Sequence, residues 1–301
     1  MTYVAPSNPE GSFVAADWAS LFARLEAVGE VEAVTRNPVF AHRKTGRFGN
    51  VRVMRDTALV LNREIDLRIF LSHWVRTVAV ADGLDVFDAD GTEVFSLRRT
   101  EATDAAAWAA VIGELAAAGE ENATLPSRSE AAACADAEVD VAGLREAWSG
   151  LTDVHQFAPM LRRFGVSRMQ ALRLAGSPWA RDAGAGALVC VLEAARAAEL
   201  PIMIFVDSPG CTQIHTGPVD EVRVRGDRLD VRGPAFALAG DLGRIGSCWA
   251  VRKPTEYGGI TTLEVFDRGG VCRAIVCGQR DPGATERPEW TDLVLSLSDA
   301  P

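Results

Sequence analysis

The sequence predicts an α+β fold of two similar halves, each a large antiparallel β-sheet with flanking helices, and a ligand cleft between the halves. Two observations support this prediction. Residues 35–97 and residues 207–276 share the order and much of the spacing of their distinctive residues, which indicates an internal duplication. Within each half, strand-like and helix-like runs are segregated, which favours α+β over an alternating α/β fold. A cleft between two packed units is a preferred place for a ligand.

The duplication is read from short motifs that recur in the same order. His42 stands 32 positions before Trp74, and His215 stands 34 positions before Trp249. The other matching motifs are Val-Arg-Val at residues 51–53 and 222–224, and Val-Phe-Asp at residues 86–88 and 265–267. We therefore expect His42 and His215 to occupy matching places. The part of the chain that is not duplicated then breaks the symmetry and carries the functional difference.

The first repeat unit is expected over residues 13–118. Apolar residues at helical spacing in residues 15–28, followed by Gly29, predict a helix. Alternating Val, Ile and Leu with intervening turn residues predict strands across residues 31–97. An Ala-rich stretch at residues 103–118 predicts a second helix.

A linker and a helical insert follow the first repeat. Residues 119–139 are polar, acidic and Ala-rich, which is typical of a linker. The insert is expected over residues 140–200 and carries His155. Its helices are predicted at residues 141–150, 154–164, 167–175 and 187–200. The second repeat unit then spans residues 201–301, with strands to about residue 279 and a closing helix over residues 290–297.

Composition and charge exclude several classes of protein. The chain has 301 residues, a net charge of −10 and a pI near 5.0. It therefore lacks the basic footprint of a general nucleic-acid-binding protein. The first residues show no signal peptide, and the apolar runs are too short to span a membrane. Six cysteines without an export signal are expected to be reduced, so we expect a cytoplasmic protein.

Searches for common catalytic and metal motifs find none of them. The sequence contains no Cys-x-x-Cys, no His-Glu-x-x-His and no paired zinc spacing. It also contains no strand-associated Gly-x-Gly-x-x-Gly, no Walker phosphate loop and no Gly-x-Ser-x-Gly elbow. The sequence therefore does not indicate a zinc, nucleotide or serine-hydrolase site. Cys272 and Cys277 are interpreted either as a metal pair or as ordinary buried strand residues.

His155 is the histidine of the insert and has no counterpart in the first copy. Asp153 is placed to cap the following helix, with Gln156 at capping-box spacing, so His155 lies in the first helical turn. The positive helix end disfavours an imidazolium, and a neutral imidazole is the form that binds a transition metal. Pro159 predicts a kink or a delayed helix start. His155 falls off the apolar stripe, so an exposed or capping histidine is the alternative. That stripe consists of Val154, Phe157, Leu161 and Phe164.

Arg68 is the first of three basic residues that could bind an anionic ligand. Alternation of Leu67 and Ile69 on one face of a predicted strand places Asp66 and Arg68 on the other face. The alternative is an exposed Asp66–Arg68 ion pair, which would contribute little to stability.

Lys253 and Arg280 follow strands of the second copy. They are interpreted either as ordinary charges at strand ends or as groups that recognise a dianionic ligand through its carboxylates.

Several short segments, in their order and spacing, resemble a known family over about residues 20–297. The segments are Leu25-Glu-Ala-Val-Gly-Glu-Val31, Thr35-Arg-Asn37, Ile65-Asp-Leu-Arg-Ile-Phe70 with His73-Trp74, Thr152-Asp-Val-His-Gln-Phe157, Cys211-Thr-Gln-Ile-His-Thr-Gly-Pro218, Arg252-Lys-Pro-Thr255 and Gly278-Gln-Arg280. The chain resembles the HemS/HmuS/PhuS-type haemin-degrading or haem-trafficking factors of bacterial haem uptake. The resemblance implies one haem b between the two halves, bound as ligand or as substrate.

The resemblance also implies roles for individual residues. His155 aligns with the family's axial ligand of the haem iron, and Arg68 aligns with its distal arginine, so both are candidate catalytic residues. Lys253 and Arg280 align with basic residues near the haem edge and propionates.

The segment before Arg280 contributes two further candidates for haem contact, Cys277 and Gln279. Cys277 stands where the family often has an aromatic residue, which replaces a haem-edge contact with a small thiol.

Two functions follow from this resemblance, and the sequence leaves both open. The first is an enzyme that degrades haemin to release iron, given an external electron donor. The second is a carrier that delivers haem to a separate haem oxygenase. A third interpretation is a haem-free protein that binds another flat, hydrophobic anion. A haem oxygenase or a reductase is the partner expected in the first two cases. We also expect a monomer, because the duplication already supplies the two-fold pairing of a dimer.

Overall fold

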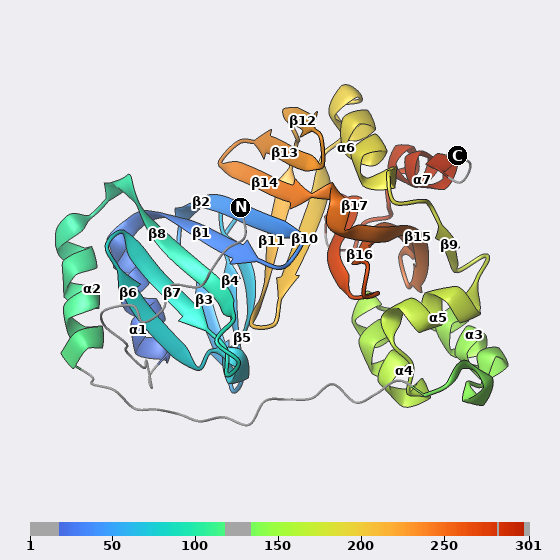
Figure 1. The fold of residues 1–301 in the computed structure, drawn as a ribbon, viewed down its shortest axis with the longest axis horizontal. Coiled ribbons are helices and arrows are strands. Elements are labelled where there is room, and N and C mark those ends of the chain that lie inside the picture. The colour runs from blue at the N-terminus through green and yellow to red at the C-terminus, as the bar shows by residue number, and fades with distance from the viewer. Residues whose placement is uncertain (1–17, 118–133, 282, 298–301) are drawn as a thin grey trace.

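The computed structural model describes residues 18–117, 134–281 and 283–297 (Figure 1). The first repeat begins with a helix, continues through a series of strands and ends with a second helix, as predicted. Its elements are α1 (Trp18–Leu25), η1 (Glu26–Val28), β1 (Gly29–Arg36), β2 (Phe40–Arg47), β3 (Val51–Met54), β4 (Thr57–Leu61), β5 (Asp66–Phe70), η2 (Leu71–His73), β6 (Arg76–Val80), β7 (Gly83–Phe87), β8 (Glu93–Thr103) and α2 (Ala105–Ala117).

The rest of the described chain forms the insert and the second repeat. The predicted linker over residues 119–139 lies largely outside the described residues. The elements of the insert are η3 (Asp136–Glu138), α3 (Val141–Ser149), η4 (Val154–Gln156), α4 (Phe157–Phe164), α5 (Arg168–Ala175) and β9 (Ala180–Asp182). The elements that follow are α6 (Ala187–Ala197), β10 (Ile202–Ser208), β11 (Cys211–Gly217), β12 (Glu221–Arg225), β13 (Arg228–Gly233), β14 (Phe236–Asp241), η5 (Leu242–Arg244), β15 (Ile245–Thr255), β16 (Gly258–Asp267), β17 (Cys272–Gly278) and α7 (Pro288–Ser296).

The two repeats exchange strands, which the sequence did not reveal. The described strands form two antiparallel sheets of eight and nine strands. Sheet A has the order β12-β13-β14-β2-β1-β8-β7-β6, and sheet B has the order β3-β4-β5-β11-β10-β17-β16-β15-β9. Each repeat therefore contributes three strands to the other sheet, through the pairs β14–β2 and β11–β5. The predicted fold of two similar halves with large antiparallel sheets is confirmed, but neither sheet is built from one half alone.

Strand register corrects the predicted match between the two histidines. His42 pairs with Thr35 and stands four positions before Gly46. In the second repeat it is Gln213 that pairs with Val206 and stands four positions before Gly217. His42 therefore corresponds to Gln213, and the counterpart of His215 is Lys44. The paired positions are seven residues apart in both repeats, so the two hairpins are equally long here, and the motif comparison matched two histidines that differ by two strand positions.

The predicted match between Trp74 and Trp249 is also wrong, for a different reason. Trp74 precedes β6, whereas Trp249 lies inside β15, where it pairs with Glu264. The Val-Phe motifs do match, because each sits at the bulge that joins its strand to the last strand of the repeat.

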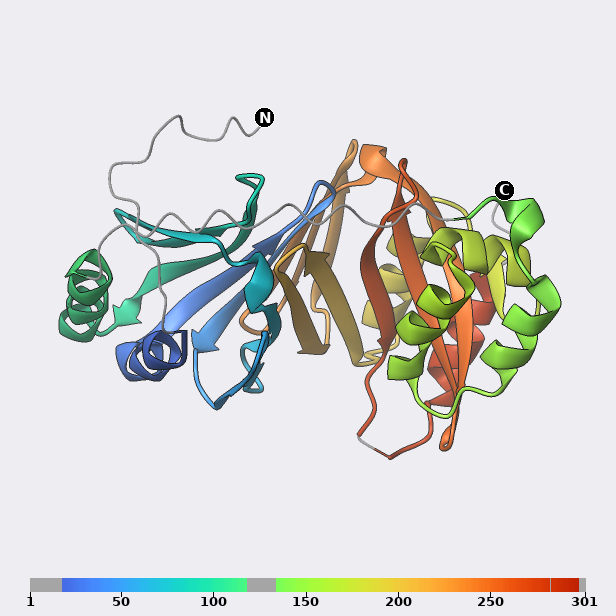
Figure 2. The same cartoon turned by 90° about the horizontal axis from the view of Figure 1, so that it is seen from below.

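The β15–β16 hairpin is eight residues longer than its counterpart β6–β7. Arg76 pairs with Phe87, 11 positions away, whereas Ser247 pairs with Phe266, 19 positions away. The added tip reaches the insert, where Trp148 of α3 donates a hydrogen bond to the carbonyl of Arg252. Figure 2 shows α3, α4 and α5 gathered at this end of the molecule, far from α1 and α2. The unduplicated insert thus rests on an unduplicated part of sheet B.

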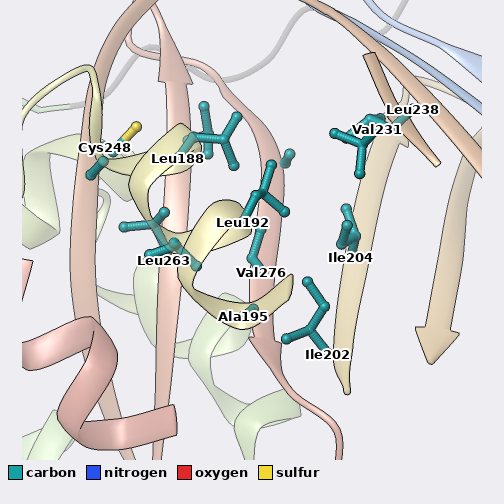
Figure 3. Close-up of a cluster of buried hydrophobic side chains, with 14 of the residues drawn as sticks. Leu188, Leu192, Ala195, Ile202, Ile204, Val231, Leu238, Cys248, Leu263 and Val276 are labelled. Atoms are coloured by element: carbon teal, nitrogen blue, oxygen red, sulfur yellow. The ribbon is translucent and has the colours of Figure 1, made fainter. Parts of the chain in front are cut away.

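The two sheets share an apolar core. Figure 3 shows Leu188 and Leu192 of α6 among side chains of sheet B such as Leu263 and Val276. The same cluster continues to Val231 of sheet A. This face of sheet B is therefore occupied by the core, and only its opposite face is available to the insert and to a ligand.

No helix among the described residues is long and apolar enough to cross a membrane.

Candidate functional site

His155 lies in a short 3-10 turn, η4, whose geometry follows from the local sequence. The Asp153 side chain accepts a hydrogen bond from the His155 backbone N–H, and the Gln156 side-chain oxygen accepts one from the Asp153 backbone N–H, which completes the predicted capping box. Helix α4 begins at Phe157, so Pro159 falls in its first turn, where no backbone N–H is needed. The delayed start predicted from Pro159 is confirmed. The side chain of His155 is 91% exposed, as expected for a residue off the apolar stripe.

Asp153 fixes the tautomer of the His155 ring. The Asp153 carboxylate lies 2.7 Å from the His155 backbone nitrogen and 2.6 Å from its ring Nδ1. These two hydrogen bonds lower the pKa of Asp153, so it is an ionised acceptor at neutral pH. In the neutral ring Nδ1 therefore carries the proton, and Nε2, which bonds to no residue that the structure describes, presents a lone pair. A histidine held by a carboxylate in this way is a common arrangement for a metal ligand.

Arg68 projects from β5 on the face of sheet B opposite the core. Leu67 and Ile69 are fully buried on the core side, as the alternation predicted. Arg68 forms an ion pair with Asp66, which the sequence analysis gave as the alternative to a ligand-binding role. It also donates a hydrogen bond to the carbonyl of Leu67 at 3.1 Å. About a third of the Arg68 side chain remains exposed. Thr212 of β11 is directly opposite it in the strand pairing.

An apolar strip runs across the middle of the same face. In β10 and β17 the side chains facing the core are buried, and those facing away are only half-buried. The half-buried residues in the centre are Met203 and Phe205 of β10 and Ile275 and Cys277 of β17, which pair across the two strands. The strip lies between β5, which carries Arg68, and β15–β16, which the insert covers. Two neighbouring strands thus offer a flat apolar surface, with Arg68 on one side and the insert that bears His155 on the other.

Arg280 lies just beyond the end of β17, close to the His155 turn. The hydrogen bonds from His155 are the main cause of the lowered pKa of Asp153, and the Arg280 charge adds to it from within electrostatic reach. Its Nη1 also donates to the carbonyl of Ala284 at 3.4 Å. Gln279 is anchored by its backbone N–H to the carbonyl of Pro201. Burial raises the pKa of the Cys277 thiol to about 12, so the thiol stays protonated and is a poor metal ligand.

Lys253 is buried beneath the insert, on the same face of sheet B as the strip. Its side chain is 5% exposed, and its Nζ donates to Glu264 at 2.5 Å. Burial lowers the pKa of Lys253, and the Glu264 charge opposes that effect. The predicted contact of Lys253 with ligand carboxylates stays a prediction, and it would require Lys253 to leave this buried partner.

Three charged residues near the site were not predicted as site residues from the sequence. Asp207 lies on the same face as Arg68 and bonds to Thr212, the neighbour of Arg68 in the strand pairing. Arg168 starts α5 and lies within electrostatic reach of both Asp207 and Glu264. The one available signal was Glu264 itself, a lone carboxylate in the apolar run Leu-Glu-Val-Phe, because such a residue is buried only with a partner.

Two other features of the described residues bear on alternative sites. No group of three or more His, Cys, Asp and Glu side chains that could hold a bare metal ion occurs among them. A cavity of about 380 Å³ opens between Trp179, Arg181 and Leu295, but none of the predicted site residues lines it.

Comparison with known proteins identifies the family of this chain. The family described as the haemin-degrading HemS.ChuX domain matches residues 4–115 and 165–297. The chain belongs to this HemS/ChuX family. Arg68, Lys253 and Arg280 lie inside the matched segments, and His155 lies between them.

Individual relatives cover nearly the whole chain, including the insert. The hemin transport protein HemS of Yersinia enterocolitica is 34% identical over 94% of this chain and 84% of its own length. The crystal structure of holo-PhuS, a heme-binding protein from Pseudomonas aeruginosa, superposes with a TM-score of 0.90 at 37% identity, over 95% of this chain and 87% of that one. ChuS, described as an E. coli heme oxygenase, superposes with a TM-score of 0.85 at 30% identity, over 96% and 89%. The suspected family is confirmed.

Proposed function

We propose that this protein binds one haem b on the open face of sheet B, as part of cytoplasmic haem uptake and iron acquisition. The observation that carries the proposal is the His155 imidazole, whose Nδ1 is held by Asp153 while Nε2 remains available. Bound haem would supply a redox-active iron to this site. HemS, PhuS and ChuS, which match nearly the whole chain, are named for hemin transport, heme binding and heme oxygenase activity.

The residues present fit the chemistry of haem. The half-buried strip of Met203, Phe205, Ile275 and Cys277 matches a flat apolar macrocycle. Arg280, beside the His155 turn, is placed to pair with a propionate. Arg68 is held by Asp66 on the far side of the strip, where it would stand over the iron face opposite His155.

Haemin titration followed by absorption spectroscopy tests this proposal. Wild type is expected to give a saturable one-to-one Soret band, and His155→Ala to shift or weaken it. His73→Ala is the matched control, because His73 lies in η2 outside the site. Absence of a saturable band in wild type would overturn haem binding. An unchanged band in His155→Ala would remove His155 as the ligand.

The proposed activity is degradation of haemin to release iron, and the alternative is delivery of haem to a separate oxygenase. Adding a reductant to the haem complex in air separates the two. Decay of the Soret band with release of iron supports degradation by this chain with an external electron donor. A persistent band that moves to an added haem oxygenase supports the carrier. Arg68→Ala is expected to slow decay in the first case while leaving most of the haem affinity intact.

A further inference from the structure

A cavity of about 380 Å³ lies at the β9 edge of sheet B, and none of the proposed haem-site residues lines it. Three segments form its walls. They are β9 with the residues before it, which contribute Trp179 and Arg181, the later part of β15, which contributes Arg252, and α7, which contributes Leu295. Figure 1 shows β9, β15 and α7 at the end of the molecule opposite α1 and α2. The volume lies within the range of about 300–1,000 Å³ that is usual for small-molecule pockets, near its lower limit.

Two arginines stand side by side in this cavity. Arg181 of β9 pairs with Ala250 of β15, and Arg252 follows Ala250 by two positions. Paired residues, and residues two positions apart on a strand, point to the same face of a sheet. Both arginine side chains therefore leave from one face, with only the methyl group of Ala250 between them. The core covers this face in the middle of the sheet, and the cavity opens at its outer edge.

The two guanidinium groups make the cavity locally positive. Like charges at neighbouring positions of a sheet repel each other. No acidic side chain among the described residues lines the cavity to offset them, although the chain as a whole has a net charge of −10. A bound anion would remove this repulsion.

Neither guanidinium group has all of its donors paired. Nη2 of Arg181 donates to the carbonyl of Leu295 at 2.7 Å, but Nε of Arg181 is buried and has no hydrogen-bond partner in the part of the chain that the structure describes. The side chain of Arg252 lies over Gly259, where a Cβ atom would stand only 2.8 Å from its Nε. The Arg252 guanidinium forms no ion pair or hydrogen bond with any described residue. Buried donors in proteins are normally paired, so an acceptor on a ligand would complete this arrangement.

Trp179 gives the cavity a flat aromatic wall. Its ring stacks on Trp148, with the ring centroids 6.2 Å apart and the planes inclined by 26°. Trp148 is fully buried, so it supports the Trp179 ring from behind, while Trp179 itself is only half-buried. An indole face of this kind binds other aromatic rings by stacking.

We propose that this cavity is a second ligand site, which binds a flat aromatic group that carries one phosphate, as in a mononucleotide. Two guanidinium groups match a phosphate monoester, whose charge is about −1.5 to −2 at neutral pH, better than they match a single carboxylate. The Trp179 ring stacks on the aromatic group. The proposal does not depend on haem binding, because the two sites share no residue.

Isothermal titration calorimetry of the full chain with a set of small probes tests this proposal. AMP and flavin mononucleotide carry both a phosphate and an aromatic ring, and they distinguish a purine source from a flavin source. Adenosine and riboflavin lack the phosphate, and ribose 5-phosphate lacks the ring. We expect saturable one-to-one binding of AMP, of flavin mononucleotide or of both. Each probe that lacks one of the two groups should bind more weakly, on the order of tenfold, because stacking and charged hydrogen bonds contribute comparably.

Variants of the cavity wall locate the binding. Arg252→Gln should weaken nucleotide binding on the order of tenfold to a hundredfold, because it removes charged hydrogen bonds to the phosphate. Arg252→Lys should restore only part of the loss, since an ammonium is a point charge without the fork of a guanidinium. Trp179→Leu should weaken nucleotide binding and leave that of ribose 5-phosphate unchanged. Arg225→Gln is the matched control, because it makes the same change of charge at an exposed residue of β12, in sheet A.

Four results would overturn the proposal. Absence of saturable binding for both AMP and flavin mononucleotide would remove the site. Binding of ribose 5-phosphate as tight as that of the nucleotide would show that only the phosphate is recognised. Equal nucleotide affinities in Arg252→Gln and wild type would place the nucleotide elsewhere on the chain. Loss of nucleotide binding when haemin is added would place it on the haem face of sheet B.

Discussion

At the scale of single residues, the Asp153–His155 pair decides what the site can bind. A free imidazole on the surface exchanges tautomers and orientations, but a carboxylate on Nδ1 fixes both. Asp153 performs two tasks, because the same carboxylate caps the turn and holds the ring. The capping box was visible in the sequence, whereas the ring contact was not, since it depends on the side-chain conformation of His155.

Replacing Asp153 by Asn separates these two tasks. Asn is as good a helix cap as Asp, so the turn should be kept. The loss of charge on the acceptor should weaken haemin binding by about tenfold or more, as for other carboxylates behind a metal-binding histidine. Asp140→Asn is a matched control, because Asp140 caps α3 of the same insert and touches no histidine. Equal haemin affinities for the two variants in a titration would contradict this role.

The site could be predicted from sequence where its geometry is local. The alternation around Arg68 and the cap before His155 span only a few positions, and both are confirmed. The partners of Lys253 could not be predicted in this way. Glu264 lies across the β15–β16 hairpin from it, so their contact depends on the strand register, and Arg168 reaches Glu264 only because the insert packs on this hairpin.

At the scale of elements, the contact between the insert and the long hairpin is the structural basis of the asymmetry. Trp148 is fully buried, packs edge-on against Phe157 and donates to Arg252 at 2.9 Å. Helices α3–α5 share a cluster with Val251 but have no strand of the first repeat beneath them. We therefore expect the insert to open as a unit when this contact is weakened.

Trp148→Phe tests this expectation. Loss of the indole hydrogen bond should lower the free energy of unfolding by about 1–3 kcal/mol, because a carbonyl acceptor loses its partner. Amide hydrogen exchange should speed up in α3–α5 and stay unchanged in β1 and β2. Trp290→Phe is the matched control, since Trp290 of α7 donates the same kind of bond to Thr261 at 2.8 Å on the opposite face. Faster exchange in α3–α5 for both variants would argue against a separate opening unit.

At the scale of the whole molecule, strand exchange determines how the repeats depend on each other. Helix and strand positions followed from periodicity, and the duplication followed from recurring motifs. The pairing of β5 with β11 and of β14 with β2 did not follow, because alternation shows which face of a strand is buried but not which strand lies beside it.

Lowering the pH should lower the free energy of unfolding, because two histidines are buried in the neutral form. Burial lowers the pKa of His42 well below its usual value and lowers that of His215 to about 3. The unfolded chain therefore binds more protons below about pH 6.5, so stability is complete above that pH and falls as the pH drops. Between pH 7.5 and 5.5, each histidine should lower the free energy of unfolding by about 1.4 kcal/mol. The raised pKa values of Asp66 and Asp207 act in the opposite direction.

Urea unfolding of wild type and His42→Leu at pH 7.5 and 5.5 measures this effect. The difference in the free energy of unfolding between pH 7.5 and 5.5 should be about half as large in the variant as in wild type. This holds whatever the stability of the variant at pH 7.5. An equal pH dependence in both proteins would show that His42 is not held neutral by the fold.

The exchange of strands also predicts how an isolated repeat behaves. In residues 1–117 alone, β3–β5 lack β11, and β2 lacks β14, so two unpaired edges are left exposed. A second copy can satisfy both edges, because its β2 is the counterpart of β11 and its β5 is the counterpart of β14. We therefore expect this fragment to form a strand-exchanged homodimer, and the full chain to be a monomer, in analytical ultracentrifugation at equal concentration. A folded monomeric fragment would mean that β5 can pair with β2 of its own copy. The exchange would then follow from joining two repeats in one chain and would not be a property of each repeat.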